Sequence, residues 1–228
     1  MSDRPTALVT GASRGIGRAI ALRLAADHDI LAVARSADDL RALAGEIEGR
    51  GGRCRVIPLD VTDAAAVRER LADVEADVLV NNAGVGVMKP LLEMELEEWA
   101  RQLDVNVNAL FHVTRAVLPG MVRRGSGYVI TIGSLAGRNT FAGGTAYTGT
   151  KHFVNGFSES LMLEVRDRGV RVSVVMPGSV DTDFGRGHSG ASWKLSAEEV
   201  AEAVAYLVGT PPHALVSRIE MRPAIPKK

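Results

Sequence analysis

Apolar positions along this chain follow two different periods. Short β-branched runs alternate with longer stretches in which apolar residues recur at helical spacing. The runs predict strands over residues 6–9, 30–34, 55–59, 78–81, 128–132, 171–176 and 217–221, and the longer stretches predict helices over 16–27, 36–49, 64–72, 97–123, 147–168 and from 196 onward. Such alternation is typical of a parallel sheet with helices on both faces. The pattern therefore predicts an α/β fold, a single doubly wound domain over 1–228 with about seven parallel strands.

Composition excludes several classes of protein. The chain has 27 Lys and Arg against 27 Asp and Glu, so its formal net charge is +0 at pH 7. Non-specific nucleic-acid binding, which depends on an excess of cationic side chains, is therefore not expected. The single cysteine, Cys54, has no partner for a disulfide and no neighbouring cysteines for a metal site. No stretch is apolar for long enough to predict a signal peptide or a membrane span, so we expect a cytoplasmic protein without a metal.

A glycine-rich turn joins the first expected strand to the first expected helix. It reads Thr10-Gly11-Ala12-Ser13-Arg14-Gly15-Ile16-Gly17. Backbone N–H groups and the helix dipole at such a turn can hold a phosphate, and glycine leaves room for it, as in the Rossmann fold. The spacing G-x-x-x-G-x-G departs from the usual G-x-G-x-x-G, so a glycine turn without a ligand stays open as an alternative. The contacts expected with a dinucleotide are Gly11, Ser13, Arg14, Gly15, Ile16 and Gly17.

The end of the second expected strand indicates which dinucleotide binds. An NAD site generally places a carboxylate about 20 residues beyond the glycines, whereas an arginine there suits the 2′-phosphate of NADP. Arg35 occupies this position, and Arg14 is placed to join it. Asp38 and Asp39 follow, where their simpler role is in the first turn of the next helix. We therefore predict NADP(H), with NAD(H) as the less favoured cofactor.

A tyrosine, a lysine and a serine indicate acid–base chemistry. Tyr147 and Lys151 are four positions apart and so share one face of a helix. The pKa of tyrosine is near 10, and a neighbouring cation favours the phenolate, so Lys151 is expected to make Tyr147 a usable acid and base. In isolation, such a pair is more often a surface tyrosine with a solvated lysine. Ser134 changes this interpretation because it follows a strand at the carboxyl edge of the sheet, where its hydroxyl can donate to a substrate oxygen.

Together these motifs resemble the short-chain dehydrogenase/reductase superfamily. The residues that carry the resemblance are Thr10 to Gly17, Asp60, Asn81-Asn82-Ala83-Gly84, Asn106, Ser134, Tyr147, Lys151 and Pro177-Gly178. The resemblance implies that Tyr147 is the catalytic acid/base, that Lys151 lowers its pKa and bonds the nicotinamide ribose, and that Ser134 polarises the substrate carbonyl. It also implies that Asn106 holds a water in a proton relay. Asn108, two positions later, is expected to be a capping or surface residue.

The same resemblance implies further contacts with the cofactor. Those residues are Asp60 and Val61 at the adenine, Asn82, Ala83 and Gly84 beside the adenosine ribose, and Pro177, Gly178, Val180 and Thr182 at the nicotinamide carboxamide. Asn81 and Asn82 are also turn-forming residues, and we expect both roles to hold for this motif. The cofactor brings the hydride, and the protein supplies orientation and a proton.

Three segments are expected to line the substrate pocket in such a fold. They are residues 85–91, residues 135–145 and a short lid over about 183–195, and they offer Val85, Met88, Leu135, Phe141, Phe184 and Trp193. This apolar lining fits a small or medium carbonyl compound or secondary alcohol. Arg186 and His188 lie in the lid and are expected to be solvated.

We therefore predict an NADP(H)-dependent oxidoreductase that acts on a carbonyl or secondary alcohol (EC 1.1.1.-). A 3-oxoacyl-acyl-carrier-protein reductase is the alternative, although the ending 218–223 lacks the glycine pair usual in those enzymes and looks closer to hydroxyacid dehydrogenases and carbonyl reductases. A non-catalytic NADP-binding sensor is the distant alternative.

The resemblance also implies a homo-oligomer, either a dimer or a tetramer. In the superfamily, the helices here expected over 97–123 and 147–168 usually form a dimer interface. Leu110, Phe111, Phe157 and Leu161 fit such an interface, and they fit the core of one chain equally well.

Overall fold

Seven parallel strands form one sheet in the computed structural model, which describes residues 4–184 and 190–225. The strands are β1 (Thr6–Thr10), β2 (Asp29–Ala34), β3 (Cys54–Pro58), β4 (Val78–Asn81), β5 (Gly127–Ile132), β6 (Val170–Pro177) and β7 (Arg218–Met221). Their order across the sheet is β3-β2-β1-β4-β5-β6-β7, and every neighbouring pair is parallel. The expected strands agree with these bounds to within one residue at each end. The predicted fold class is confirmed.

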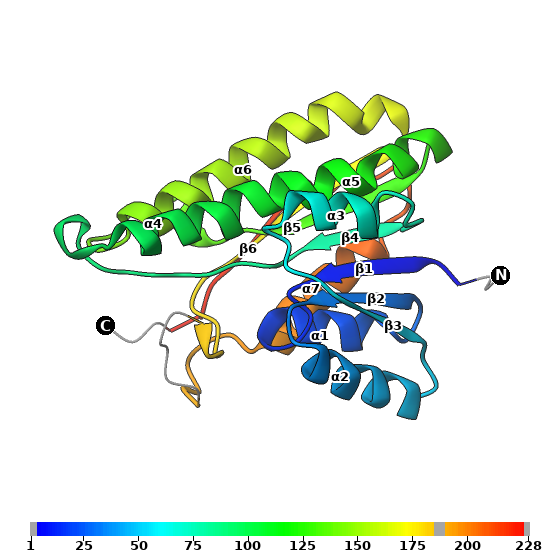
Figure 1. The fold of residues 1–228 in the computed structure, drawn as a ribbon, viewed down its shortest axis with the longest axis horizontal. Helices are drawn as coiled ribbons and strands as arrows, with labels where there is room; N and C mark the ends of the chain where they lie inside the picture. The colour runs from blue at the N-terminus through cyan, green and yellow to red at the C-terminus, as the bar shows by residue number, and fades with distance from the viewer. Residues whose placement is uncertain (1–3, 185–189, 226–228) are drawn as a thin grey trace.

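Helices cover both faces of the sheet (Figure 1). The helices are α1 (Gly15–Leu24), α2 (Ala37–Gly49), α3 (Ala64–Leu71), α4 (Leu96–Leu103), α5 (Ala109–Arg124), α6 (Thr145–Val165) and α7 (Ala197–Val208), with short 3-10 turns at η1 (Leu91–Glu93), η3 (Leu135–Gly137) and η4 (Arg166–Arg168). Helices α1, α2 and α7 share one hydrophobic core, and α3, α5 and α6 share the other. In Figure 1, α3 to α6 lie above the sheet and α1, α2 and α7 lie below it.

The central strands are mostly apolar because both of their faces are covered. In β1, Ala7 and Val9 pack into the core on the α1 side, while Leu8 packs into the core on the α3 side. Side chains of a strand alternate between its two faces, so a continuous apolar run is what a buried parallel strand requires. All three side chains are fully buried.

Sequence-encoded signals begin and end several helices. The Ser36 hydroxyl accepts the backbone N–H of Asp39 and so caps α2. Gly169 follows η4 with a left-handed φ of 76°. A Cβ at this position would lie 2.0 Å from the carbonyl oxygen of Gly125, so only glycine fits there.

The prediction of one continuous helix over 97–123 is wrong. A π-helical segment, η2 (Asp104–Asn108), separates α4 from α5. The side chain of Asn106, within this segment, bonds the backbone N–H and the carbonyl of Val85 at 2.8 and 2.9 Å. One extra residue in a helical turn breaks the regular spacing of apolar positions only slightly, so the sequence pattern did not reveal it.

Because all strands are parallel, their carboxyl ends meet at one edge of the sheet, on the left in Figure 1. The glycine turn after β1, the turn after β4 and the loop after β5 all leave the sheet at this edge. Ligands of open α/β sheets bind at this edge. Within the part of the chain that the structure describes, no helix is long and apolar enough to cross a membrane.

Candidate active site

One large cavity opens at the carboxyl edge of the sheet. It is lined by the glycine turn, the ends of β2 and β3, the turn after β4, the loop after β5, the start of α6 and the segment after β6. Ser134, Tyr147 and Lys151 line it, as does every cofactor contact expected from the sequence except Gly17. The structure therefore brings the predicted residues together in one place. Across residues 4–184 and 190–225, no group of three or more His, Cys, Asp or Glu side chains is arranged to hold a metal ion.

The glycine turn adopts a backbone that its glycines make possible. Gly11 and Gly15 have left-handed φ angles of 64° and 54°. Gly17, expected to contact the cofactor, instead packs α1 against the turn, because a Cβ there would lie 2.2 Å from the carbonyl oxygen of Gly11. The N-terminus of α1 carries no acidic residue in its first turn and lines the cavity through Gly15 and Ile16. This end of the helix therefore presents free N–H groups and a positive dipole to a phosphate.

Thr10 and Asn82 tie the glycine turn to the turn after β4. The Thr10 hydroxyl accepts the backbone N–H groups of Asn82 and Ala83 at 2.9 and 3.1 Å and donates to the carbonyl of Val80. The Asn82 side chain donates to the carbonyl of Thr10 at 2.9 Å and to that of Gly11 at 3.3 Å. The Asn81 side chain donates to the Thr114 hydroxyl instead. The structural role expected for this motif is thus present.

Arg35 and Asp60 lie beside each other at the ends of β2 and β3. The Asp60 carboxylate accepts the N–H and the hydroxyl of Thr62 at 3.0 and 2.8 Å. Although desolvation acts to raise it, these hydrogen bonds and the charge of Arg35 hold the pKa of Asp60 below its usual value. Arg35 is exposed in the cavity wall. Asp39, at the start of α2, also lines the cavity, so this end holds charges of both signs.

Tyr147 and Lys151 are buried on the first turns of α6. Their side chains are 8% and 7% exposed, and the Lys151 ammonium lies 5.8 Å from the centroid of the tyrosine ring. The ammonium donates to the carbonyl of Ile132, the last residue of β5, at 3.1 Å. Two positions later, the Ser134 hydroxyl accepts the N–H of Ala136, and its influence acts to lower the pKa of the Tyr147 hydroxyl. Helix α6 and the end of β5 thus place the three polar side chains in one apolar wall.

In the protein without a bound ligand, Lys151 does not lower the pKa of Tyr147 as expected. Burial raises the pKa of Tyr147, and the influence of Ser134 only opposes that rise. Burial also lowers the pKa of Lys151 to about 8. Both groups lose hydration in this wall, which disfavours the phenolate and the ammonium alike. At neutral pH Tyr147 is consequently a proton donor.

Asn106 lies behind the cavity and not in its wall. Its amide oxygen accepts the N–H of Val85, and its amide nitrogen donates to the carbonyl of Val85 and to the Thr150 hydroxyl. A small hollow of about 20 Å³ is lined in part by Asn106 and Lys151. This volume is enough for one water molecule. Asn108 is exposed and bonds Asp104, as expected for a surface residue.

The apolar side chains expected around the substrate all line the cavity, namely Val85, Met88, Leu135, Phe141, Phe184 and Trp193. The Phe184 ring lies 5.9 Å from the Tyr147 ring. A Cβ on Gly86 would lie 2.6 Å from the Phe184 ring and 3.0 Å from the terminal methyl of Met88, so this glycine leaves room for both side chains. Arg186 and His188, expected in the lid, lie outside the described residues.

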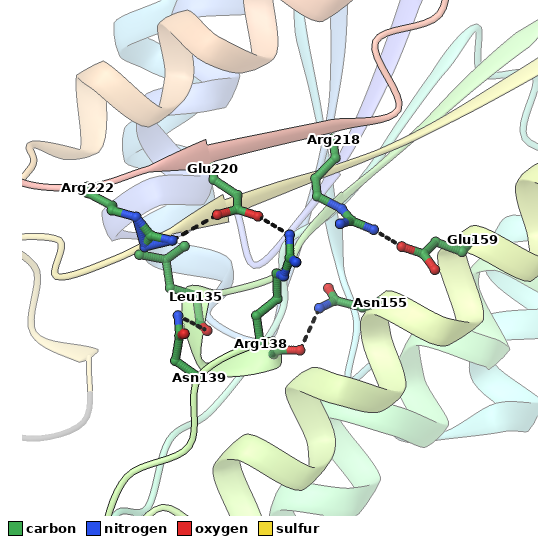
Figure 2. Close-up of polar contacts among 9 residues, drawn as sticks. Leu135, Arg138, Asn139, Asn155, Glu159, Arg218, Glu220 and Arg222 are labelled. Carbon is green, nitrogen blue, oxygen red and sulfur yellow. Dashed lines mark hydrogen bonds and ion pairs between the residues drawn. The ribbon is translucent and has the colours of Figure 1, made fainter.

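Two cavity residues near the end of the chain are not among those expected from the sequence. Arg222 and Pro223 follow β7 and line the cavity beside Leu135. Figure 2 shows Glu220 between Arg222 and Arg138. The alternation Arg218, Glu220, Arg222 was the available signal, because it places three charged residues on one face of the strand. Only the sheet order shows that this face ends at the cavity.

Comparisons with known proteins agree with this geometry. A family model described as short chain dehydrogenase matches residues 5–191. The NADP-dependent 3-hydroxy acid dehydrogenase YdfG of Escherichia coli (strain K12) is 38% identical, with 95% of this chain and 94% of that protein covered. The 3-oxoacyl-acyl-carrier-protein reductase FabG of the same strain is also 38% identical, with 88% of each chain covered.

Solved structures extend the likeness to three dimensions. An alcohol dehydrogenase from the archaeon Thermococcus sibiricus, complexed with 5-hydroxy-NADP, matches with a TM-score of 0.93 and 32% identity over 99% of each chain. The resemblance inferred from the motifs is confirmed, and this chain belongs to the short-chain dehydrogenase family.

Proposed function

We propose that this chain is an NADP(H)-dependent oxidoreductase that interconverts a carbonyl compound and a secondary alcohol. The observation that carries the proposal is the buried group of Ser134, Tyr147 and Lys151 in the wall of a cavity that also contains the glycine turn. The named relatives that depend on or bind NADP support the choice of cofactor. The bound dinucleotide supplies the hydride in this chemistry.

The residues at one end of the cavity fit a phosphorylated dinucleotide. The amino end of α1 and the glycine turn suit the pyrophosphate. Arg35 and Arg14 are exposed in the cavity wall, and neither forms an ion pair among the described residues. These guanidinium groups are suited to a 2′-phosphate because they offer several donors in a fixed plane. Thr182 lies over the same glycine turn, since a Cβ on Gly15 would be 3.5 Å from its methyl group.

Tyr147 and Ser134 supply the proton and the orientation in the proposed mechanism. The substrate oxygen accepts hydrogen bonds from both hydroxyls, which polarise the carbonyl. Tyr147 then donates its proton to that oxygen as the alcohol forms, and its raised pKa favours this direction at neutral pH. Lys151 places a buried cation one turn away, which stabilises the phenolate that remains. A water molecule in the hollow beside Asn106 would return the proton from solvent.

A 3-oxoacyl-acyl-carrier-protein reductase is the second candidate, because FabG matches with the same percentage of identical residues as YdfG. A non-catalytic NADP-binding sensor is the third candidate. We favour an enzyme over the sensor because the three polar side chains are buried together, an arrangement that is costly unless it serves chemistry. A cytoplasmic location is supported by the single cysteine, which has no partner in the chain for a disulfide.

We also propose a homo-oligomer that forms through α5 and α6. Phe111 on α5 and Phe153 on α6 are 51% and 42% exposed. Phe153 stacks on Phe157, with ring centroids 5.8 Å apart. Leu110 and Leu161, which the sequence left open between core and interface, are buried within the chain. Large exposed aromatic side chains on neighbouring helices are typical of an interface between subunits.

Replacement of the proposed acid tests the mechanism. Tyr147→Phe should lower kcat at least about 100-fold, because it removes the proton donor, while the Kd for NADPH stays the same. The measurement is NADPH oxidation with a panel of ketones, aldehydes, acetoacetyl thioesters and keto acids. Tyr206→Phe, at an exposed tyrosine of α7, is the matched control and should keep full activity. An active Tyr147→Phe variant would refute the assignment. Tight NADPH binding without turnover of any compound by the unaltered protein would favour the sensor.

Replacement of the proposed phosphate ligand tests cofactor choice. Arg35→Ala should weaken NADPH binding about tenfold or more and leave NADH binding nearly unchanged, because the ribose hydroxyl of NADH carries no charge. Fluorescence titration with each cofactor measures both Kd values. Arg41→Ala removes an exposed arginine of α2 that pairs with Asp38, and it should change neither. Equal affinity of the unaltered protein for the two cofactors would contradict the proposal.

The buried lysine predicts a dependence of stability on pH. The pKa of Lys151 is about 8 in the folded protein and near 10.5 in the unfolded chain, so between these values only the unfolded chain holds the proton. Stability contributed by this group is therefore low below pH 8 and rises with pH. Lys151→Met removes the effect, so its stability relative to the unaltered protein should fall by about 2 to 3 kcal/mol from pH 7 to pH 10.

Urea unfolding followed by circular dichroism measures this difference. Lys89→Met, at a partly exposed lysine that pairs with Glu98, is the control and should show no such change. A difference between Lys151→Met and the unaltered protein that is independent of pH would show that the ammonium is well solvated.

The mass in solution tests the oligomer. Light scattering should give a multiple of the mass of one chain. The double variant Phe111→Asp/Phe153→Asp should shift the protein to single chains, because it buries two charges in the proposed interface. Leu92→Asp, at an exposed leucine of η1, is the control and should keep the original mass. A single-chain mass for the unaltered protein would disprove the proposal.

A further inference from the structure

Strand β7 carries a row of charged side chains on one face. Arg218 and Glu220 occupy alternate positions of β7, and Arg222 continues this spacing directly after its last residue, so the three side chains lie on the same side of the sheet in Figure 2. Ile219 and Met221 project to the other side and pack against the core beneath α1 and α7. The charged row therefore faces α6 and the loop after β5, as Figure 2 shows. Since β7 is the last strand in the sheet order, it forms one edge of the sheet.

The charges in this row are unequally paired. Arg218, at the start of the strand, has its own carboxylate, Glu159 of α6. Glu220 accepts a hydrogen bond from Arg138 at 2.6 Å and another from Arg222 at 2.8 Å. The bond from Arg138 holds the pKa of Glu220 below its usual value, so this carboxylate is charged at neutral pH. Two guanidinium groups share one carboxylate, and the cluster Arg138, Glu220 and Arg222 keeps an excess of one positive charge.

That excess charge lies at the cavity. The N–H of Gly178 donates to the carbonyl of Met221 at 2.9 Å, which places Arg222 next to the Pro177-Gly178 turn. The position of a Cβ on Gly178 would be 3.0 Å from the Leu135 side chain and 3.5 Å from the Pro223 ring. Leu135 directly follows Ser134 in the chain. Among the three arginines of the row and its loop, only Arg222 lines the cavity that contains Ser134 and Tyr147.

The other arginines in the cavity wall lie elsewhere, and the two lysines there are Lys151, which is buried beside Tyr147, and Lys194, in the segment after β6. Arg14, Arg18 and Arg35 belong to the glycine turn, α1 and the end of β2, and Arg101 lies on α4 with Glu97 and Asp104 nearby on that helix and its π segment. Asp181 and Asp183 also line the cavity, so the cavity as a whole is not cationic. An anionic group on a substrate would therefore be bound by one nearby guanidinium group and not by the summed electrostatic field of the cavity. Arg222 is the arginine next to the Ser134 loop.

We propose that Arg222 binds a carboxylate of the substrate, and that the substrate class is therefore hydroxy acids and the corresponding keto acids. This inference rests on the proposed function, because it names the substrate of the same site. Arginine presents five N–H donors in a rigid plane, and its geometry matches a carboxylate. Glu220 accepts a hydrogen bond from Arg222 and so orients the Arg222 side chain. Because Arg138 also bonds Glu220, the carboxylate does not fully neutralise the charge of Arg222.

A matched pair of substrates tests this proposal. Acetoacetate and methyl acetoacetate share the reacting carbonyl and differ in charge, so the ratio of their kcat/KM values reports carboxylate recognition. Arg222→Gln should lower the acid-to-ester ratio about tenfold or more, chiefly through a higher KM for the acid. Arg222→Lys, which keeps the charge, should restore part of the ratio. Arg218→Gln, on the same face of β7 but paired with Glu159 and outside the cavity, is the matched control and should leave the ratio unchanged.

A second variant acts in the opposite direction. Glu220→Gln removes the carboxylate that competes for Arg222, so it should raise the acid-to-ester ratio several-fold. A merely structural role of this cluster would not produce opposite shifts in the two variants. Thermal unfolding and the Kd for NADPH show that each variant is folded.

Each outcome has a distinct meaning. An acid-to-ester ratio that Arg222→Gln leaves unchanged, or an unaltered protein that prefers the ester, overturns the carboxylate proposal while the oxidoreductase stands. An unaltered protein that binds NADPH but reduces no carbonyl compound overturns the proposed function itself.

Discussion

The arrangement of the site depends on the hydrogen bonds of the Thr10 hydroxyl. This hydroxyl accepts two backbone N–H groups from the turn after β4 and donates to a carbonyl at the end of that strand. The side chain of Asn82 completes the connection by bonding the carbonyls of Thr10 and Gly11. A turn that runs so close to a neighbouring backbone leaves no room for side chains, which explains the glycines at 11 and 17. The position of α1, and with it the positive end of its dipole, follows from this cross-link.

The catalytic wall shows a second constraint, the cost of burying polar groups. Lys151 donates to a carbonyl at the end of β5, and the Ser134 hydroxyl accepts the N–H of Ala136, so these two buried polar groups each have a partner within the chain. One partner leaves the other hydrogen-bonding capacity of these groups unused, which is tolerated where a substrate or cofactor supplies the rest. The perturbed pKa values of Tyr147 and Lys151 are a physical sign of a site built for chemistry.

Much of the fold was predictable from the sequence because its strands are buried on both faces and its helices carry clear caps. The grouping of the proposed catalytic residues was predictable because Tyr147 and Lys151 have helical spacing and Ser134 follows a strand. Other features depend on packing that no local pattern contains. The π segment adds a residue to a helical turn, and Asn106 within it hydrogen-bonds the backbone of Val85, which lies 21 positions away. The direction of the Tyr147 pKa shift depends on burial, and the place of Arg222 at the cavity depends on the order of the strands.

The contact between Arg138 and Glu220 has a consequence for how the molecule folds. The two residues are 82 positions apart, and the contact between Asn82 and Thr10 spans 72 positions. Contacts of such long range require large loops to close, and they are characteristic of slowly folding topologies. The cofactor end of the cavity is built from strands near the start of the chain, whereas one wall of the substrate end is completed by the final strand, β7. Closure of the substrate end therefore depends on a contact of longer sequence range than the contacts that hold the glycine turn.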